Sequence, residues 1–460
     1  MPESDHMAIS GTTGVLGLMG NPVRHTLSPL IHNTLSEELD RDLKYLPFPV
    51  EEDVPSAVRG AYLLGIQGMN VTIPHKKAVI EALVSLDTAA EMIGAVNTLV
   101  RVDGGFKGYN TDMPGLGRAL RQKGVSLAGR QVVILGAGGA SRAVCALALS
   151  EGAEKVYILN RSLEKAVELA EHFNRCCGEI RMMPLSAADY AFVPKRPSVF
   201  FQCTSLGLHE GDGLLIDDDR FYCMAEFGYD LVYNPAETPF LKKLKGLGIP
   251  CENGLSMLLQ QGIIAYELWT GTVISDELGM LVKNKLERRL YGDNLILVGY
   301  MGSGKSTTGR MVAGRKGMSF LDMDAAIEEE AGITIREIFE REGEQGFRDR
   351  ETAFLKKLSV VNTVIATGGG VVLRKENREL LRKCGRVVLL SATEETTFQR
   401  VKNDKNRPLL DASGERELKE KIRRMLENRE AAYLAAADHV VVTDGRSADS
   451  IADELQDILA

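Results

Sequence analysis

Residues 299–306 of this 460-residue chain read GYMGSGKS and fit the pattern Gly-x-x-x-x-Gly-Lys-Ser. An apolar, strand-like run precedes them and a helical pattern follows, which is the context of a loop that surrounds nucleotide phosphates with backbone amides. In such a loop we expect Lys305 to reach the β- and γ-phosphates and Ser306 to bind Mg²⁺. The predicted ATP site also includes Gly302, Ser303, Gly304 and Thr307. The motif indicates a nucleotide, but it does not identify the group that receives the phosphate.

A second glycine-rich loop lies earlier in the chain, within QVVILGAGGASRAV, residues 131–144. The pattern predicts a strand, a tight turn and a helix, which together bind the pyrophosphate of a dinucleotide at the helix N-terminus. Ser141 holds the last place of the Gly-x-Gly-x-x-Gly pattern, where a small residue still allows the helix to pack on the strand. The predicted cofactor contacts are Gly136, Gly138, Gly139, Ala140 and Ser141. A plain tight turn is the alternative interpretation.

The end of the next predicted strand distinguishes between two dinucleotides. An NAD site usually has Asp or Glu there to bind the ribose 2′-hydroxyl. This chain has Asn160, Arg161 and Ser162, with Lys165 one helical turn later. Because an arginine binds a 2′-phosphate through charge-assisted hydrogen bonds, the sequence favours NADP over NAD. The alternative is that Arg161 is an ordinary surface residue.

Four connecting segments carry more polar and charged side chains than the connections of an α/β protein usually do. They are GNPVRHTLSP, NVTIPHK, GAVNTL and GYNTDM, beginning at residues 20, 70, 94 and 108. Their hydroxyl, amide and charged groups suit a polyhydroxylated acid. A carbonyl reduction also needs a proton donor near the reacting carbon, and Lys76 and Asp112 are the natural candidates. Because the two residues are far apart in sequence, the residue types alone do not show that Lys76 and Asp112 are in contact.

The acceptor of the phosphate is indicated by charged residues after the P-loop. Asp322 and Asp324 follow a strand-like run, and their spacing predicts that both lie on one face at the strand end. Arg348 and Arg429, well separated in sequence, suit an anionic carboxylate. The backbone of three consecutive glycines, Gly368 to Gly370, would lie against a flat ligand. Arg407 lies in the charged stretch KNDKNRPLL, which we expect to form a lid that places an arginine on the transferred phosphoryl group.

Composition excludes several classes of protein. The net charge of −8 and the absence of a basic stripe argue against nucleic-acid binding. The seven cysteines form no C-x-x-C pair, which makes a disulfide framework or a thiolate zinc site a poor explanation. The N-terminus lacks the features of a signal peptide, and no apolar run reaches about 18 residues. We therefore expect no membrane span and a cytoplasmic protein.

Short apolar runs alternate with helical patterns through most of the chain, which predicts an α/β fold with parallel sheets. The expected strands are QVVILG, KVYILN, SVFFQCT and YDLVYN in the first part, and NLILVG, VIATGG, RVVLLS and HVVVTD in the second. A charged helix followed by a Gly-Asp-Asn turn predicts a boundary near residues 288–293, and we treat these residues as a linker. Residues 294–460 then form a P-loop kinase domain of the nucleoside-monophosphate-kinase type.

With these motifs in this order, residues 14–285 resemble the shikimate dehydrogenase family. The resemblance implies a substrate domain of residues 1–115 and 250–287, and a Rossmann NADP-binding domain of residues 116–249. It implies that Lys76 and Asp112 form the catalytic pair. The substrate residues that it implies are Thr26, Ser28, Thr72, Asn97 and Gln261, and those along the cofactor are Thr204, Ser205, Gly207 and Met257, with Tyr233 facing the cleft.

Three positions depart from what this family leads us to expect. Thr26 stands where serine is expected, which keeps the hydroxyl but adds a methyl group, and this leaves a related acid such as quinate open. His75 replaces an aromatic residue, and Met113 replaces a glycine and would narrow the site. None of these changes removes a proton-handling group.

Residues 294–460 resemble shikimate kinase. The resemblance implies that Asp324 holds the substrate hydroxyls and activates the acceptor, and that Asp322 supports Mg²⁺ through water. It implies that Arg348 and Arg429 bind the carboxylate, with Gly369 and Gly370 along the ring, Arg400 beside the adenine and Arg407 on the lid. The stretch around Arg407 has more lysines than the family leads us to expect.

The two halves together predict a bifunctional enzyme with NADP, ATP and Mg²⁺ as cofactors. The first half would reduce 3-dehydroshikimate to shikimate, and the second would phosphorylate shikimate to shikimate 3-phosphate. Two alternatives are a quinate/shikimate dehydrogenase fused to the kinase, and a chain in which one half is a non-catalytic binding module. We expect small-molecule partners only, and the sequence leaves a homodimer open.

Overall fold

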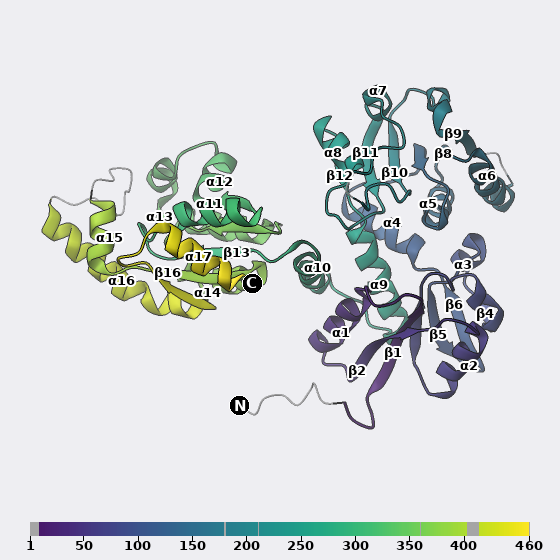
Figure 1. Ribbon diagram of the computed structural model, residues 1–460, viewed down its shortest axis with the longest axis horizontal. Coiled ribbons are helices and arrows are strands. Elements are labelled where there is room, and N and C mark those ends of the chain that lie inside the picture. The colour runs from purple at the N-terminus through teal and green to yellow at the C-terminus, as the bar shows by residue number, and fades with distance from the viewer. Residues whose placement is uncertain (1–8, 179–180, 210, 359, 403–413, 460) are drawn as a thin grey trace. The chain divides into compact units, whose positions relative to one another are not determined.

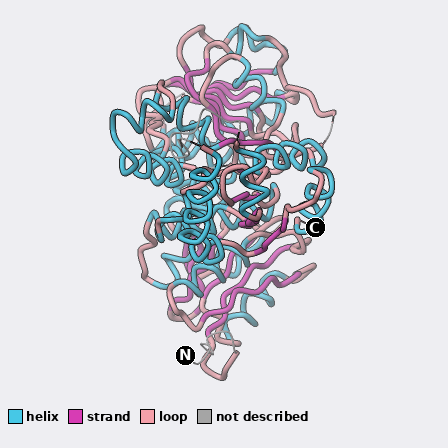
Figure 2. The backbone as a smooth tube through the Cα atoms, turned by 90° about the vertical axis from the view of Figure 1, so that its left-hand side faces the viewer, coloured by secondary structure: helices cyan, strands magenta, loops and turns pink. Residues whose placement is uncertain are grey.

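The computed structural model describes residues 9–178, 181–209, 211–358, 360–402 and 414–459. Its contacts divide the chain into two compact units, residues 1–286 and 287–460, whose elements are labelled in Figure 1. Within the described ranges, no helix combines the length and apolar character needed to cross a bilayer. All three sheets are built from short strands with helices around them (Figure 2), which confirms the predicted α/β class.

The first sheet of unit 1 is mixed and has the strand order β2-β1-β3-β5-β6-β4. Its strands are β1 (Gly14–Gly20), β2 (Leu43–Pro49), β3 (Gly68–Val71), β4 (Ser85–Leu86), β5 (Thr98–Val102) and β6 (Gly105–Tyr109). The helices that accompany it are α1 (Ser28–Glu38), α2 (Val54–Leu63), η1 (Ala78–Ala82), α3 (Thr88–Ile93) and α4 (Asp112–Gln122). The core beneath this sheet contains Val58, Met69, Leu99 and Phe106, which are almost fully buried.

The second sheet of unit 1 is fully parallel, with the order β12-β11-β10-β7-β8-β9. Its strands are β7 (Gln131–Leu135), β8 (Lys155–Asn160), β9 (Met182–Ser186), β10 (Ser198–Gln202), β11 (Ala225–Asp230) and β12 (Cys251–Glu252). Around it lie α5 (Gly139–Ser150), α6 (Leu163–Cys177), η2 (Ala187–Phe192), α7 (Asp219–Tyr222) and α8 (Pro239–Gly246). Every residue of β7 and β10 is buried, as expected for central strands covered on both faces.

Two helices follow the parallel sheet, α9 (Leu255–Thr270) and α10 (Asp276–Tyr291). Helix α9 packs against α1, α4 and β5, so it returns to the first sheet. Two glycines make these approaches possible. A Cβ on Gly68 would lie 2.2 Å from the Trp269 ring, and a Cβ on Gly115 would lie 2.7 Å from the backbone nitrogen of Gln261. Helix α10 continues through residues 288–291, the first part of the predicted linker.

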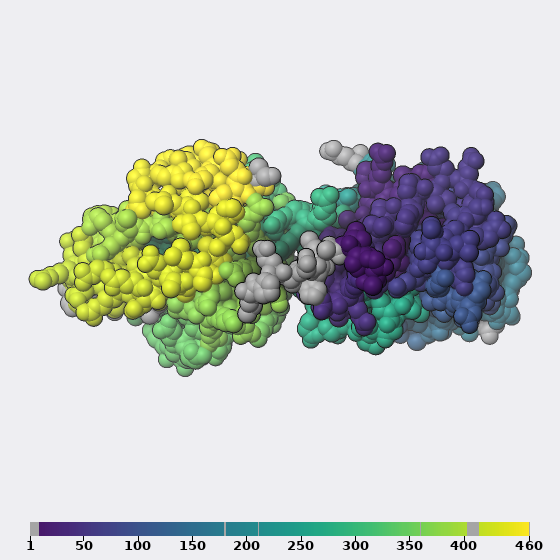
Figure 3. Space-filling view, turned by 90° about the horizontal axis from the view of Figure 1, so that it is seen from below, coloured from purple at the N-terminus to yellow at the C-terminus, as the bar shows by residue number. Residues whose placement is uncertain are grey.

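Unit 2 contains one parallel sheet with the order β14-β15-β13-β16-β17. The strands are β13 (Leu295–Val298), β14 (Ser319–Asp322), β15 (Thr363–Ala366), β16 (Arg386–Ser391) and β17 (His439–Val442). The helices are α11 (Lys305–Lys316), α12 (Met323–Ala331), α13 (Ile335–Lys357), η3 (Val371–Leu373), α14 (Lys375–Cys384), α15 (Glu394–Val401), α16 (Glu415–Ala436) and α17 (Ala448–Ile458). The C-terminal segment, yellow in Figure 3, forms part of the outer surface of this unit.

Two local predictions from the sequence are wrong. In the segment YDLVYN only Tyr229 and Asp230 belong to a strand, because β11 ends at Asp230. The buried Asp230 carboxylate accepts hydrogen bonds from the Val232 amide and the Thr238 hydroxyl, which turns the chain away from the sheet. Asp322 and Asp324 also do not share one strand face, since β14 ends at Asp322 and Asp324 lies in the first turn of α12.

Candidate functional sites

The structure brings Lys76 and Asp112 together in unit 1. Lys76 lies in the loop after β3, and Asp112 begins α4. The Lys76 amino group donates to one carboxylate oxygen of Asp112 at 2.7 Å, and the two side chains remain 31% and 21% exposed. The Val96 amide donates to the Lys76 carbonyl at 2.8 Å, which fixes this loop beside the chain that leads to Asn97. A lysine held by a carboxylate and still open to solvent is suited to donate a proton to a bound ligand.

Asn97 connects the lysine–aspartate pair to the protein interior. Its side-chain amide donates to the second oxygen of Asp112 at 2.9 Å. Its side-chain oxygen accepts from the Thr98 hydroxyl at 3.0 Å and from the Thr111 backbone amide at 2.8 Å. Because a backbone amide can only donate, the Thr111 amide fixes the position of the Asn97 oxygen, and the Asn97 amide nitrogen therefore faces Asp112. Asp112 is therefore held from two sides.

The other predicted substrate residues of unit 1 lie on the surrounding elements. The Thr26 hydroxyl donates to Ser28 at 3.2 Å, just before α1. Thr72 follows β3, and its methyl group occupies the space that a side chain on Gly20 would fill. Gln261 lies on α9, where its side-chain oxygen is 3.5 Å from the Thr111 hydroxyl. The return of α9 thus brings Gln261 to the network that holds Asp112.

The two remaining departures have structural roles. His75 is buried, and its Nε2 atom lies 2.6 Å from the Val50 carbonyl oxygen. Met113 packs with Met257 against the hydrophobic core beside the parallel sheet. Met113 therefore contributes to the packing between α4 and the dinucleotide-binding part of the unit. Tyr233, which the resemblance places along the cleft, lies in the loop after β11 and is partly buried.

The first glycine loop has the geometry of a pyrophosphate cradle. Gly136 has φ of +113°, and a Cβ there would lie 2.9 Å from the Thr204 methyl group, so the loop packs closely on the segment after β10. The buried Ser141 hydroxyl donates to the Gly136 carbonyl at 2.9 Å and closes the turn. Gly138 and Gly139 face open space, and α5 begins at Gly139 without a side-chain cap. Its first amides therefore point to a space that a pyrophosphate fits.

The basic residues predicted to bind the ribose phosphate follow β8. Strand β8 pairs with β7 in parallel register, Leu135 opposite Leu159, so both strands end at the same edge of the sheet. Arg161 and Lys165 are exposed there, and Asn160 donates to the Ser162 carbonyl at 2.9 Å. The Ser162 hydroxyl donates to Glu164 at 2.7 Å. Two cations at this edge fit a 2′-phosphate, since parallel sheets bind dinucleotides beyond the carboxyl ends of their strands.

The P-loop of unit 2 joins β13 to α11. Gly299, Gly302 and Gly304 all have positive φ, between +76° and +148°. A Cβ on Gly299 would lie 2.5 Å from the Leu390 carbonyl oxygen, so only glycine fits at that point. The amino group of Lys305 donates to the Gly299 carbonyl at 2.8 Å. The Ser303 hydroxyl is buried and makes no hydrogen bond to the described residues, which fits a loop built to contact a ligand.

Ser306 and Asp322 form a pair that fits Mg²⁺. The Ser306 hydroxyl donates to Asp322 at 2.8 Å, and Asp322 does not cap α12 although it occupies the N-cap position. Mg²⁺ in nucleotide sites is typically bound by one or two protein oxygens together with phosphates and waters. In the described part of the chain no cluster of three or more His, Cys, Asp or Glu side chains is arranged to hold a metal by itself. The pair therefore suits Mg²⁺ that arrives with phosphates.

The predicted acceptor residues gather beside the P-loop. Arg348, on the second half of α13, bonds Glu351 at 2.7 Å and Glu344 at 3.0 Å. A Cβ on Gly370 would lie 2.1–2.2 Å from the Arg348 guanidinium, and one on Gly368 would lie 2.6 Å from Asp324. The consecutive glycines thus allow two charged groups to reach the backbone. Burial raises the pKa of Glu351 to about 7, although Arg348 opposes this shift.

Arg429 and Tyr433, one turn apart on α16, approach the same glycine segment. Both donate to the Gly369 carbonyl oxygen, Arg429 at 3.3 Å. Arg429 is 8% exposed and Arg348 6%, so two guanidinium groups lie at the wall of one site and retain limited access to solvent. Two arginines around a short glycine segment can bind a carboxylate whose ring lies against the backbone.

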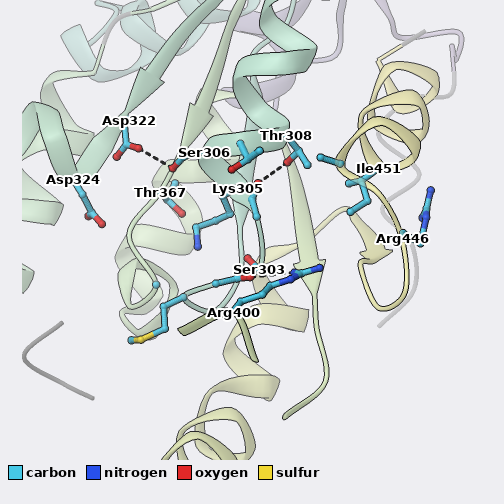
Figure 4. Close-up of a pocket in the computed structure, with 16 residues that line it drawn as sticks. Ser303, Lys305, Ser306, Thr308, Asp322, Asp324, Thr367, Arg400, Arg446 and Ile451 are labelled. Carbon is cyan, nitrogen blue, oxygen red and sulfur yellow. Dashed lines mark hydrogen bonds between the residues drawn. The ribbon is translucent and has the colours of Figure 1, made fainter. Parts of the chain in front are cut away.

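One cavity of about 590 Å³ joins the P-loop to Asp322, Asp324 and Gly369, while Arg348 and Arg429 are not among the residues that line it. It extends from Asp324 and Gly369, past the P-loop, to Arg400 at the other end. Figure 4 shows Lys305 between the two aspartates on one side and Arg400 on the other. Arg400 donates to the Gly302 carbonyl at 3.1 Å, which places it against the loop. Arg407, predicted as the lid residue, lies outside the described residues.

Several site residues were missed from the sequence. In unit 2, Arg446 and Ile451 line the cavity near Arg400. Arg446 follows β17, and the rule that ligands bind beyond the carboxyl ends of parallel strands would have indicated it. In unit 1, Asn70, Thr98 and Thr111 support Asn97. All three lie in polar segments that the sequence singled out, but the pattern did not separate them from the residues that face the substrate, because only the folded strands show which side chains meet.

The two sites define two classes of enzyme. A parallel dinucleotide-binding sheet and a lysine–aspartate pair in one unit define an oxidoreductase. A P-loop that shares a cavity with Asp324 and Gly369, with two buried arginines against the same glycine segment, defines a small-molecule kinase. Family models match both: a shikimate dehydrogenase substrate binding domain at residues 18–99, shikimate/quinate 5-dehydrogenase at 118–201, a shikimate 5′-dehydrogenase C-terminal domain at 254–277, and shikimate kinase at 301–460. The chain belongs to the shikimate dehydrogenase family and carries a C-terminal shikimate kinase domain.

Individual relatives support this assignment. Shikimate dehydrogenase (NADP(+)) of Caldanaerobacter subterraneus subsp. tengcongensis is 42% identical over 271 residues, which are 58% of this chain and 94% of that protein. A crystal structure of shikimate 5-dehydrogenase from Listeria monocytogenes with shikimate and NAD is 31% identical, with a TM-score of 0.55 over 60% of this chain and 98% of that one. The Thermus thermophilus enzyme with NADP(H) and shikimate is 32% identical, with a TM-score of 0.50 over 59% of this chain and 99% of that one.

The raised pKa of Glu351 predicts how the stability of unit 2 depends on pH. Because this pKa rises from 4.5 to about 7, the folded state keeps a proton that the unfolded state has lost in that interval. The free energy of unfolding should therefore fall as the pH rises from about 4.5 to about 7, by about 3 kcal/mol in total from this group.

Glu351→Gln should remove this loss of stability. Hydrogen exchange of α13 peptides measures this pH dependence of stability. The rates are recorded between pH 5 and 8 and corrected for the intrinsic exchange rate. Glu344→Gln is the matched control, since Glu344 also bonds Arg348 but is half exposed. An unchanged pH dependence in Glu351→Gln would contradict a buried, protonated Glu351.

Proposed function

We propose that this protein reduces 3-dehydroshikimate to shikimate with NADPH and then phosphorylates shikimate with ATP and Mg²⁺ to give shikimate 3-phosphate. The observation that carries the reduction is the 2.7 Å contact of Lys76 with Asp112, within one unit with an open pyrophosphate cradle. The phosphorylation is supported by the cavity that joins the P-loop to Asp324. The two reactions are connected, because reduction of a ketone creates the hydroxyl group that the kinase modifies.

In the reduction, the residues of unit 1 would bind the substrate and stabilise developing charge. When bound, NADPH supplies the hydride. The Lys76 ammonium group would donate a hydrogen bond to the carbonyl oxygen of the substrate, on which negative charge grows. Asp112 keeps the amino group directed by accepting one of its hydrogens. Thr26 and Ser28 would bind the carboxylate, and Thr72, Asn97 and Gln261 would bind the ring hydroxyls.

The residues that would hold NADP lie at the edge of the parallel sheet. The first amides of α5, at Gly139, Ala140 and Ser141, would bind the pyrophosphate. Arg161 and Lys165 would bind the 2′-phosphate, with Ser162 between them. Thr204 and Met257 would lie along the nicotinamide side. NADP binding is also supported by the names of relatives, although the Listeria monocytogenes structure contains NAD.

Replacing Arg161 by alanine should weaken NADP binding selectively. Because the guanidinium would meet only the 2′-phosphate, KM for NADP should rise about tenfold or more, while KM for NAD should change less than about twofold. Steady-state oxidation of shikimate with each cofactor measures both constants. Arg175→Ala is the control, because Arg175 is an exposed arginine in the last turn of α6, the helix that begins just after Arg161. Equal effects on NADP and NAD would defeat the assignment and favour an enzyme that uses NAD.

In the phosphorylation, unit 2 would bring two ligands into one cavity. When bound, Mg-ATP supplies the phosphoryl group. Ser306 and Asp322 would hold Mg²⁺, and Arg400 with Arg446 would flank the base. Arg348 and Arg429 would bind the shikimate carboxylate, and Asp324 would accept the proton of the attacking hydroxyl. Arg407 keeps its predicted lid role as a proposal from the sequence alone.

A coupled assay on the whole protein tests both reactions. The purified chain, given 3-dehydroshikimate, NADPH and ATP with Mg²⁺, should consume NADPH and form shikimate 3-phosphate, detected by mass spectrometry. Omission of ATP should stop the sequence at shikimate. Accumulation of shikimate in the presence of ATP would contradict the kinase assignment, and no consumption of NADPH would contradict the reduction.

A further inference from the structure

Tyr45 lies on β2 and is 1% exposed. Its hydroxyl donates to the side-chain oxygen of Asn70 on β3 at 2.7 Å. Burial raises the pKa of Tyr45 and the nearby Ser28 partly opposes this shift, so the hydroxyl keeps its proton and remains a donor. No role assigned above includes this residue. Strand β1 separates β2 from β3, and the Tyr45 hydroxyl reaches across β1 to Asn70.

The bond from Tyr45 determines which way Asn70 faces. The Asn70 amide nitrogen donates to the Asn97 carbonyl at 3.2 Å and to the Thr98 hydroxyl at 3.1 Å. In the flipped orientation, the Asn70 oxygen would face the Asn97 carbonyl oxygen, and two acceptors would be opposed. A donor at the Tyr45 position and an acceptor at Asn97 therefore select one orientation of the amide.

From Asn70 the hydrogen bonds continue in one direction to Asp112. Thr98 accepts from Asn70 and directs its own hydrogen to the side-chain oxygen of Asn97 at 3.0 Å. Asn97 then donates to Asp112 at 2.9 Å, and Asp112 accepts from Lys76 on its other oxygen. Each side chain in this row donates to the next member, although Asn70 also donates to the Asn97 carbonyl and Thr98 also lies 3.2 Å from the Thr111 hydroxyl. A change at Tyr45 should therefore alter the alignment of Asp112.

Tyr45 is itself held firmly from α1. Asn33 makes two hydrogen bonds to the Tyr45 backbone, accepting from its amide at 2.8 Å and donating to its carbonyl at 3.2 Å. The His32 ring stacks on the Tyr45 ring with centroids 4.3 Å apart. Burial lowers the pKa of His32 to about 3, so the ring is neutral; the nearby Asn70 opposes the shift, but His32 makes no hydrogen bond of ordinary geometry to the described residues. His32 thus fixes the tyrosine by packing alone.

We propose that Tyr45 is a positioning residue for the reduction, acting through Asn70, Thr98 and Asn97 to hold Asp112, and through it Lys76, in the reactive alignment. This inference rests on the proposed function of unit 1. It assigns to a buried tyrosine a role in turnover rather than in substrate binding. Tyr45 would not touch the substrate, and the neighbouring Ser28 is also held by the Thr26 hydroxyl. Removal of the Tyr45 hydroxyl should therefore affect kcat much more than KM.

Tyr45→Phe removes only the hydroxyl and tests this role. We expect kcat for 3-dehydroshikimate reduction to fall about tenfold, with KM for the substrate changed less than about twofold. Phosphorylation of shikimate by the same preparation should be unchanged, which verifies the concentration of chain with a folded unit 2. Tyr266→Phe is the matched control: Tyr266 is also buried near His32, but its hydroxyl bonds Ser36 and lies outside the row. An unchanged kcat in Tyr45→Phe, or an equal fall in Tyr266→Phe, would overturn the proposal.

A double-mutant cycle with Asn97→Ala separates positioning from general destabilisation. If Tyr45 acts through Asn97, Tyr45→Phe should lower kcat less than about twofold in the Asn97→Ala background. A full tenfold loss in that background would overturn the proposal. If Tyr45→Phe does not fold, as judged by circular dichroism, Thr98→Val takes its place in both measurements with the same expected results. An inactive wild-type dehydrogenase would instead disprove the proposed function.

Discussion

Lys76→Ala is expected to lower kcat for the reduction of 3-dehydroshikimate by about 10³-fold while shikimate phosphorylation by the same chain stays within about twofold of wild type. The amino group is the only cation that the structure places on Asp112 among the described contacts. By the proposed mechanism, its loss would remove both the stabilisation of charge on the substrate oxygen and the source of the proton. Stopped assays of both activities on one preparation measure the effect.

Lys77→Ala provides the control for Lys76→Ala. Lys77 is the next residue and is exposed, so its loss changes the net charge equally without reaching Asp112. We expect Lys77→Ala to retain near wild-type reduction. Loss of both activities in Lys76→Ala would contradict two independent sites. Retention of reduction would show that another group donates the proton.

Lys305→Ala is expected to have the opposite effect, with phosphorylation reduced by about 10³-fold and reduction unchanged. Lys305 is 9% exposed and lies in the wall of the 590 Å³ cavity. Its ammonium group would leave the P-loop carbonyls and neutralise the charge of the β- and γ-phosphates as the phosphoryl group moves. Release of ADP in the presence of shikimate measures the loss.

Lys316→Ala is the matched variant for Lys305→Ala, since Lys316 is the exposed last residue of the same helix. It should phosphorylate shikimate at close to the wild-type rate. Substantial kinase activity in Lys305→Ala would contradict the role of the P-loop lysine. A parallel loss of reduction in Lys305→Ala would indicate that the two units depend on each other.

Much of the site in each unit follows from local patterns in the sequence. The two glycine loops were identified because a tight turn between a strand and a helix needs glycines at fixed spacing, and these loops carry their ligand-binding amides within one short segment. Gly136 and Gly304 have the positive φ angles that such turns require. Ser306 and Lys305 are likewise local to their loop. The parallel sheets follow from continuous apolar runs.

The predictions that failed concerned where regular structure ends. Strand β11 ends at Asp230 because a buried carboxylate accepts hydrogen bonds from the following turn, and no apolar pattern reports that. Asp324 lies in a helix rather than on a strand because α12 starts immediately after Asp322. The spacing of two acidic residues describes their geometry only after the secondary structure is known.

By itself, the sequence determined the two nucleotide-binding loops, the α/β class and, through its resemblance to two families, the residues worth considering. Only the tertiary structure decided which of them meet. Lys76 and Asp112 are 36 positions apart and touch because the loop after β3 lies beside the first residue of α4. Arg348 reaches Gly370 because α13 packs against the chain after β15. Tyr45 is connected to Asp112 only through strands that pair across the first sheet. Hydrogen bonds form between atoms within about 3 Å, and that distance between remote residues is set by packing rather than by local pattern.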